Sequence, residues 1–143
     1  MHVKVKRLNP QVQLPKYMTE GAAGCDVYAR LETPISLQPA CRVAVSTGLA
    51  FEIPRGFEIQ VRPRSGLALK SGVTVINAPG TIDSDYRGEL KVLLVNHGQD
   101  SMVIQDGDRI AQLVLGRVEQ IQWGEATDLG GTSRSSGGFG STG

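Results

Sequence analysis

The sequence predicts an all-β domain of the sandwich, barrel or jelly-roll kind, with one short helix and a flexible glycine-rich C-terminal tail. Apolar residues recur with a period of two along most of the chain, which is the pattern of strands with one buried face. Turn-forming Gly, Pro, Asn and Asp residues separate these short runs, as in antiparallel β architectures. From residue 130 onward the chain is Gly, Ser and Thr with one Arg and one Phe, which predicts a mobile tail.

Five segments carry the strand pattern most clearly. Residues 2–6 and 43–45 show apolar side chains at every second position, and residues 57–62 alternate most regularly of all. Residues 90–95 are almost continuously apolar, which predicts a strand buried on both faces. Residues 110–118 have the same character with two polar interruptions, so we expect a second buried strand there.

One segment departs from the strand pattern. Residues 65–70 (SGLALK) contain helix formers and lie between a Pro-Arg pair and Gly72. Ser65 is a residue type that caps helix N-termini, because its hydroxyl can accept a hydrogen bond from a free backbone N–H. We therefore expect a short helix with Ser65 as its N-cap.

The length of 143 residues corresponds to one domain, which we place at residues 1–129, followed by the tail at 130–143. A net charge of +1 offers no electrostatic case for nucleic acid or a membrane surface as a partner. The N-terminus lacks the apolar segment of a secretory signal, and no run of about 18 apolar residues occurs. We expect a cytoplasmic protein.

The cysteine and histidine content argues against a structural metal site. Cys25 and Cys41 have no CxxC spacing, and the only histidines are His2 and His97. A structural zinc site needs about four nitrogen or sulfur ligands at close spacing. Zinc is therefore not expected, and the two cysteines are expected to be reduced thiols.

Residues 63–68 (PRSGLA) form the first stretch with a chemical pattern, because they join an expected strand to the expected helix. A helix N-terminus presents free backbone N–H groups and a partial positive charge, which suit phosphate. Arg64 can add a planar pair of charge-assisted hydrogen bonds, and Gly66 lets a ligand approach the backbone. The alternative is a plain strand-to-helix turn with a solvated arginine.

Residues 77–89 (NAPGTIDSDYRGE) form the second stretch. Asp83 and Asp85 would share a face if they lay in a strand, and two close carboxylates can prepare one of them to act as a base. The turn at 77–80 could read the edge of a planar base with backbone groups, and Tyr86 could stack on a sugar. The alternative is a polar hairpin with solvated carboxylates.

The tail is the third stretch. Its Arg134 and Phe139 stand among Gly and Ser residues, and it lacks the G-K-[ST] ending of a nucleotide-triphosphatase P-loop. An aromatic ring in a segment that cannot form a core suggests docking on a ligand. Arginine can pair with a phosphate, and phenylalanine can stack on a base.

Together these stretches resemble the trimeric dUTPase family over essentially the whole chain. Five motifs appear in the family's order, at residues 23–27, 63–68, 80–89, 107–113 and 134–143. Each motif alone is common, but all five in this order are specific. The resemblance implies a jelly-roll-like fold and hydrolysis of dUTP to dUMP and pyrophosphate by water attack on the α-phosphate. That reaction limits uracil incorporation into DNA and supplies dUMP for dTMP synthesis.

The resemblance also implies roles for the residues of the third motif. Asp83 would orient and deprotonate the attacking water and accept a hydrogen bond from the 3′-OH. Tyr86 would pack flat under the deoxyribose and leave no room for the 2′-OH of UTP. Asn77, Thr81 and Ile82, with the backbone up to Asp83, would read uracil through base-pair-like hydrogen bonds.

A second group would hold the phosphates and the cofactor that the family uses, Mg²⁺. Arg64, Ser65 and Gly66 would bind phosphate oxygens, and Gln112 would contact the α-phosphate. Asp26 would contact Mg²⁺ through water, since Mg²⁺ keeps several waters and binds chiefly to substrate phosphates.

The implied assembly is a homotrimer with active sites at the subunit interfaces. One site would draw the first, second and fourth motifs from one chain, the third motif from a neighbour and the fifth from the remaining chain. The tail would close over the site, with Arg134 at the γ-phosphate, Phe139 over the uracil, and Gly140 in the substrate-binding set. Lys91 matches a position that lines the nucleotide site.

Two residues depart from the family pattern, and two rival functions stay open. Ser135 stands where the tail motif usually has Gly, and Cys25 stands where Tyr or Phe is common. A dCTP deaminase-like enzyme would share the fold but needs a pocket that favours cytosine. A non-catalytic trimeric nucleotide-binding scaffold would not require a general base such as Asp83.

Overall fold

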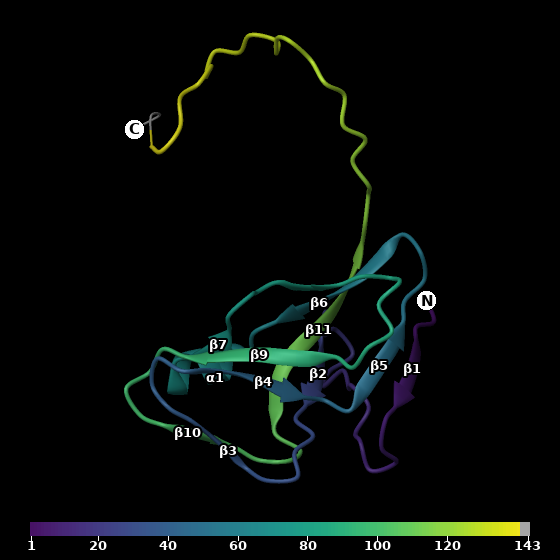
Figure 1. Cartoon of the computed structure of the whole chain (residues 1–143), viewed down its shortest axis with the longest axis vertical. Coiled ribbons are helices and arrows are strands. Elements are labelled where there is room, and N and C mark those ends of the chain that lie inside the picture. The colour runs from purple at the N-terminus through teal and green to yellow at the C-terminus, as the bar shows by residue number, and fades with distance from the viewer. Residues whose placement is uncertain (141–143) are drawn as a thin grey trace.

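The computed structural model describes residues 1–140 and confirms the all-β prediction (Figure 1). The last three residues of the predicted tail, 141–143, lie outside the described residues. Within residues 1–140 the chain forms eleven strands and one helix: β1 (Lys4–Arg7), β2 (Cys25–Tyr28), β3 (Ile35–Leu37), β4 (Arg42–Ser46), β5 (Leu49–Glu52), β6 (Phe57–Arg62), α1 (Ser65–Ser71), β7 (Val73–Val75), β8 (Gly80–Ile82), β9 (Lys91–Asn96), β10 (Met102–Ile104) and β11 (Arg109–Arg117).

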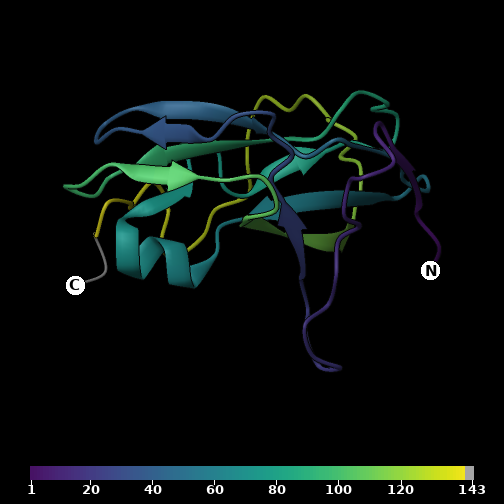
Figure 2. The same ribbon diagram turned by 90° about the horizontal axis from the view of Figure 1, so that it is seen from below.

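The strands pair in antiparallel sheets around one hydrophobic core. The larger sheets have the strand orders β2-β11-β6-β8 and β4-β9-β7, and two further pairs are β1-β5 and β10-β3. Seen from below, the strands lie in stacked layers with the short helix at one edge (Figure 2). The core consists of aliphatic side chains from these layers, and its fully buried members include Val27, Val45, Leu49, Leu90 and Ile110. This is the jelly-roll-like fold that the sequence predicts.

Strand β11 is the element that brings distant motifs together. It runs between β2 and β6, and its register places Gln112 opposite Asp26 on one side and Arg62 on the other. Directly opposed residues of antiparallel strands have their Cβ atoms only about 5 Å apart. Side chains that are far apart in the sequence therefore meet in one row across the sheet.

The predicted alternation of residues 57–62 is confirmed. The prediction that residues 90–95 form a strand buried on both faces is wrong, because one face of this strand is exposed. In β6, Ile59 and Val61 are buried while Glu58 and Arg62 are more exposed. In β9, Leu93 is 38% exposed because no other layer of the chain covers this face of the strand. The exposed face lines a cavity instead.

The predicted helix is confirmed as α1, but the prediction that Ser65 is its N-cap is wrong. Arg64 takes the cap position with an extended backbone, and its carbonyl accepts the first hydrogen bonds, from Leu67 and Ala68. No side chain caps this end, so Ser65 and Gly66 lie inside the first turn. The helix ends at Gly72, whose φ of 66° is the left-handed conformation that favours glycine.

Both cysteines are free, as the sequence predicts. Cys25 packs against the core, and burial is the main cause that raises the pKa of its thiol. A raised pKa keeps the thiol protonated and unreactive. The described residues contain no helix that is long and apolar enough to cross a membrane.

Asp106 ties the loop after β10 to the segment after β2. The N–H of Leu31 donates to its Oδ1 at 2.8 Å, and Nη1 of Arg30 donates to its Oδ2 at 2.9 Å. The backbone hydrogen bond is the main cause that lowers the pKa of Asp106, and Arg30 adds to it. The ionised carboxylate is therefore favoured in the folded state.

We expect Asp106→Asn to destabilise the fold by about 0.5 kcal/mol at neutral pH, because the carboxylate is half-exposed and its ion pair is screened. A depressed folded-state pKa stabilises the fold above the unfolded pKa of about 4, and this contribution is lost as the pH falls through the folded pKa. Urea unfolding at pH 7 and pH 3 measures the difference. Asp128→Asn, on an exposed segment, is the matched control. Equal destabilisation at both pH values would contradict the assignment.

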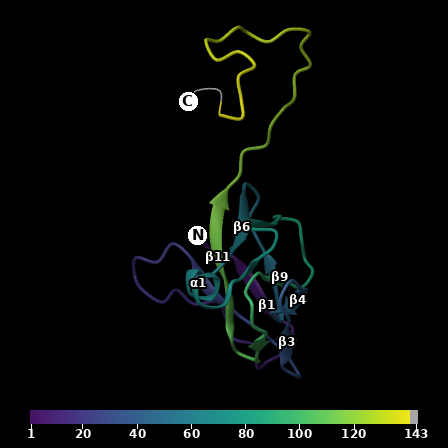
Figure 3. The same cartoon turned by 90° about the vertical axis from the view of Figure 1, so that its left-hand side faces the viewer.

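Beyond β11 the chain leaves the body and extends as an arm (Figures 1 and 3). The arm carries exposed apolar side chains, and Ile121, Trp123 and Leu129 are among the most exposed of the large apolar residues. Exposed apolar groups of this size on a segment without a core are typical of surfaces that another chain covers.

Candidate functional site

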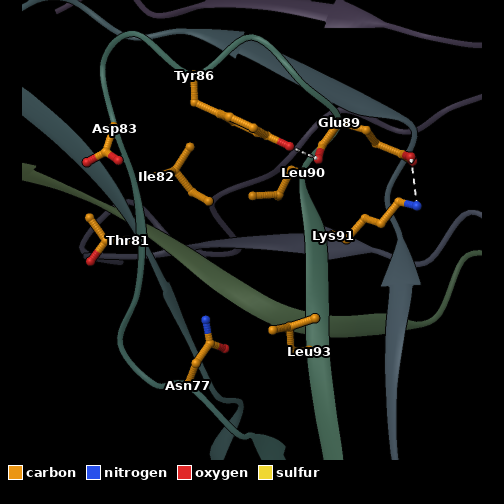
Figure 4. Close-up of a pocket in the computed structure, with 9 residues that line it drawn as sticks. All are labelled: Asn77, Thr81, Ile82, Asp83, Tyr86, Glu89, Leu90, Lys91 and Leu93. Atoms are coloured by element: carbon orange, nitrogen blue, oxygen red, sulfur yellow. Dashed lines mark hydrogen bonds and ion pairs between the residues drawn. The ribbon is translucent and has the colours of Figure 1, made fainter.

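A cavity of about 620 Å³ lies between the segment 77–90 and strand β9 (Figure 4). Its lining combines an amide, two carboxylates, an ammonium group and a phenol with aliphatic side chains, a mixture typical of small-molecule sites. The lining residues are Asn77, Thr81, Ile82, Asp83, Tyr86, Glu89, Leu90, Lys91 and Leu93. Six of the predicted site residues therefore meet in one cavity.

Strand β8 and the turn before it set the floor of this cavity. β8 pairs with β6, which places Gly80 opposite Val61 and Ile82 opposite Ile59. A Cβ on Gly80 would come within 3.1 Å of Nδ2 of Asn77 and 3.3 Å of Cβ of Val61. Glycine at this position therefore lets the Asn77 amide lie close over the strand.

Asp83 stands at the end of β8, in a turn rather than in a strand. The strand ends at Ile82, and the carbonyl of Asp83 accepts a hydrogen bond from the N–H of Tyr86 at 3.2 Å. The condition for Asp83 and Asp85 to share a strand face is therefore not met. Asp83 lines both the cavity and a larger neighbouring hollow of about 930 Å³, whereas Asp85 lines only the hollow.

Tyr86 forms one wall of the cavity. Its ring extends from the turn toward Glu89, and its hydroxyl donates to the carbonyl oxygen of Glu89 at 3.0 Å (Figure 4). The side chain of Glu89 accepts the N–H of Gly48 at 2.9 Å and lies 3.9 Å from Nζ of Lys91. Glu89 was not predicted as a site residue, and its only signal in the sequence is its place at the end of the third motif.

A second group of predicted residues surrounds a buried carboxylate. Asp26 is 2% exposed and accepts hydrogen bonds from Nη1 of Arg109 at 3.0 Å and Nε2 of Gln112 at 3.2 Å. Nε of Arg64 lies 3.4 Å from Oδ1 of the same carboxylate. The cross-strand row of β2 and β11 creates this cluster. Arg109 was not predicted as a site residue, although it belongs to the fourth motif.

The charge of this cluster favours an anion. One carboxylate is balanced by two guanidinium groups, so a positive charge remains. The guanidinium of Arg64 also donates to the carbonyl of Arg109 at 3.1 Å, which orients the two arginines relative to each other. Both arginine side chains stay partly exposed, and Ser65 and Gly66 are exposed beside them. An arginine fork near the first turn of a helix is suited to phosphate oxygens.

The predicted tail residues lie away from both groups in the single chain (Figure 3). Nε of Arg134 donates to the carbonyl of Gly137 at 2.8 Å, and the ring of Phe139 is fully exposed. Ser135 has a φ of 47°, in the left-handed region that favours glycine, and Gly140 has a φ of 87°. Ser135, which replaces the usual glycine of the family pattern, therefore has a backbone conformation in which glycine would be less strained.

The structure thus presents a nucleoside-sized cavity, an arginine-rich cluster and an extended arm as three separate groups. Within residues 1–140, no cluster of three or more His, Cys, Asp or Glu residues could hold a metal ion. An antiparallel β fold that carries these groups has the features of a protein that binds a small phosphorylated ligand.

Comparison with known proteins identifies the particular family. The dUTPase family model matches residues 10–143, and the chain therefore belongs to the dUTPase family. A deoxyuridine 5'-triphosphate nucleotidohydrolase of Anaeromyxobacter is 56% identical, with 99% of this chain and 97% of the relative covered. That of Syntrophotalea carbinolica is 52% identical, with 99% and 96% covered.

Solved structures share the fold. The dUTPase of Staphylococcus bacteriophage 80alpha superposes with a TM-score of 0.87 at 23% identity, covering 99% of this chain and 98% of that chain. A variant of the dUTPase from phage phi11 of S. aureus gives a TM-score of 0.81 at 20% identity, with 90% and 98% covered. At these identities the likeness concerns the fold.

Proposed function

We propose that this protein hydrolyses dUTP to dUMP and pyrophosphate by attack of water on the α-phosphorus. Such a reaction limits uracil incorporation into DNA and supplies dUMP for dTMP synthesis. The observation that carries the proposal is the placement of Asp83 beside Asn77 and Tyr86 in one cavity, in a chain of the dUTPase family. A carboxylate next to a base-and-sugar pocket is suited to act as a general base.

The cavity takes the nucleoside. Asn77 and the backbone from Thr81 to Asp83 hydrogen-bond the uracil edge, and Ile82 contributes an apolar surface to the same wall. Tyr86 packs against the deoxyribose, where a 2′-OH would collide with the ring. Lys91 lines the same cavity and adds a positive charge near the nucleotide. A site built from such hydrogen bonds rejects a base with the wrong donor pattern.

The cluster around Asp26 takes the phosphates. Arg64 offers a guanidinium fork, Ser65 and Gly66 offer the exposed first turn of α1, and Gln112 reaches the α-phosphate. These groups hold the phosphorus in line with the water that Asp83 deprotonates. Positioning and charge stabilisation then account for most of the catalysis, as in phosphoryl transfer generally.

The residues fit a Mg²⁺ ion that is held mainly by the substrate rather than by a protein cage. The described part of the chain has no cluster of acidic ligands, and both oxygens of Asp26 already accept hydrogen bonds. Asp26 would therefore contact the ion only through water, since Mg²⁺ keeps several waters and binds substrate phosphates. When bound, Mg²⁺ neutralises charge on the triphosphate. The phage phi11 dUTPase coordinates a structural Mg(II) ion.

A homotrimer unites the three groups. In one chain the arginine cluster does not line the cavity, and the tail lies apart from both. A neighbouring chain that contributes the third motif, and a further chain that contributes Arg134, Phe139 and Gly140, complete each site. The tail at 130–143 closes over the nucleotide, while residues 1–129 form the β domain. The exposed residues of the arm after β11, Trp123 among them, are covered by neighbouring chains in this assembly.

Mixed trimers test this sharing of sites. Asp83→Asn and Arg64→Ala chains are each expected to be nearly inactive alone. If the two residues act from different chains, random 1:1 trimers keep about a quarter of their sites intact, and activity returns. Pyrophosphate release from co-expressed, doubly tagged trimers measures the recovery. Mixtures as inactive as the parents would show that one chain supplies both residues.

A pyrophosphate-release assay with dUTP, dCTP, dTTP and UTP tests the reaction itself. We expect turnover of dUTP and little turnover of the others. Ammonia release from dCTP would support the deaminase-like alternative instead. Binding of dUTP without any turnover would support the non-catalytic scaffold.

A further inference from the structure

Gly88 lies directly against the ring of Tyr86. A Cβ built on Gly88 would collide with the Tyr86 hydroxyl and would come within 2.6 Å of Cζ and 3.0 Å of Cε2. The backbone of Gly88 is not in the left-handed region, so the turn itself does not demand glycine here. What demands glycine is the space that the aromatic ring occupies.

Hydrogen bonds fix the backbone that follows Gly88, at Glu89 and Leu90. The hydroxyl of Tyr86 bonds to the carbonyl of Glu89, and the side chain of Glu89 accepts the N–H of Gly48. The N–H of Leu90 donates to the carbonyl of Leu49 at 2.7 Å, and the hydroxyl of Thr47 donates to the carbonyl of Leu90 at 2.7 Å. A side chain at position 88 would therefore displace the ring rather than the backbone.

We propose that Gly88 is a specificity-determining positioning residue. Its bare backbone lets the Tyr86 ring lie flat and reach the carbonyl of Glu89, which fixes the wall of the cavity at the sugar. This inference rests on the proposed function, in which that wall excludes the 2′-OH of UTP. Tyr86 is 46% exposed as a residue, so a ring displaced by a side chain at position 88 has room to move toward solvent and open the wall of the cavity.

The test is Gly88→Ala, with kcat and KM measured for dUTP and UTP. We expect the preference for dUTP over UTP in kcat/KM to fall by roughly tenfold, which is the range that one badly fitting group produces in a pocket. The loss should appear mainly as a higher KM for dUTP, because Asp83 is not touched by the substitution. Gly21→Ala is the matched control, since a Cβ there meets open space.

A double-mutant cycle with Tyr86→Ala separates this role from a general structural one. If Gly88 acts through the ring, Gly88→Ala changes neither selectivity nor melting temperature in the Tyr86→Ala background. Should Gly88→Ala alone fold poorly, recovery of folding in the double variant supports the contact, and failure to recover overturns it. Unchanged selectivity in a folded Gly88→Ala enzyme also overturns the proposal. A wild type that does not hydrolyse dUTP refutes the proposed function instead.

Discussion

Asp83→Asn is expected to lower kcat for dUTP by about 10²- to 10⁴-fold, the usual contribution of a positioned general base. Asparagine keeps the shape of the side chain but cannot take a proton from water. The side chain stands at the boundary of the nucleoside cavity, where it can also meet the 3′-OH. Binding of dUTP should therefore change far less than turnover.

Steady-state pyrophosphate release gives kcat for this variant, and calorimetry with a non-hydrolysable analogue gives its affinity. Asp85→Asn is the matched control, because it removes a carboxylate from the same turn but from a residue outside the cavity. We expect the control to retain most of the turnover. Near-normal turnover of Asp83→Asn would remove this residue from the catalytic role.

Deleting residues 134–143 is expected to lower kcat/KM by roughly 10²- to 10³-fold while leaving the fold intact. The deletion removes one arginine–phosphate contact and one aromatic stacking contact, each of which contributes about 1–3 kcal/mol. The hydrogen bonds of Arg134 and Gly137 stay within the tail, so the body loses no contact of theirs. Stability of the domain should therefore not change.

Activity and mass are measured together for the truncated chain, the latter by sedimentation. Two single substitutions, Arg134→Ala and Phe139→Ala, show how much of the loss in kcat/KM comes from the arginine charge and how much from the phenylalanine ring. Ser135→Gly is a control that keeps both contacts and relieves the left-handed backbone at this position. Aggregation or a changed mass of the truncated chain would show that the tail is structural.

Hydrophobic periodicity and residue type predict some elements of the fold correctly, but they give wrong predictions at particular residues. The alternation in β6 predicts its buried face correctly, because a strand with one buried face must alternate. The apolar run in β9 is misleading, because Leu93 faces a cavity instead of a second layer. Ser65 is a common N-cap residue type, yet Arg64 takes that place because the helical backbone already begins at Ser65.

Within the site, motif order predicts residue types but not their partners. Asp26 and Gln112 are predicted as site residues, and both are found in one cluster. The partner that binds Asp26 most closely, Arg109, was not predicted, because its position depends on the register of β11 against β2. Glu89 and Gly88 were not predicted either, because Glu89 contacts the distant Gly48 and the contact of Gly88 with Tyr86 depends on the fold of the turn.

The sequence alone determined the β class, the short helix, the glycine-rich tail and the family, since these follow from periodicity, composition and local motifs. Tertiary structure alone decided which side chains meet. Cross-strand register placed two arginines and a glutamine around the buried Asp26, and the fold of the turn at 83–89 seated the Tyr86 ring over Gly88. The contacts around Asp26 join residues far apart in the chain, so no local pattern records them.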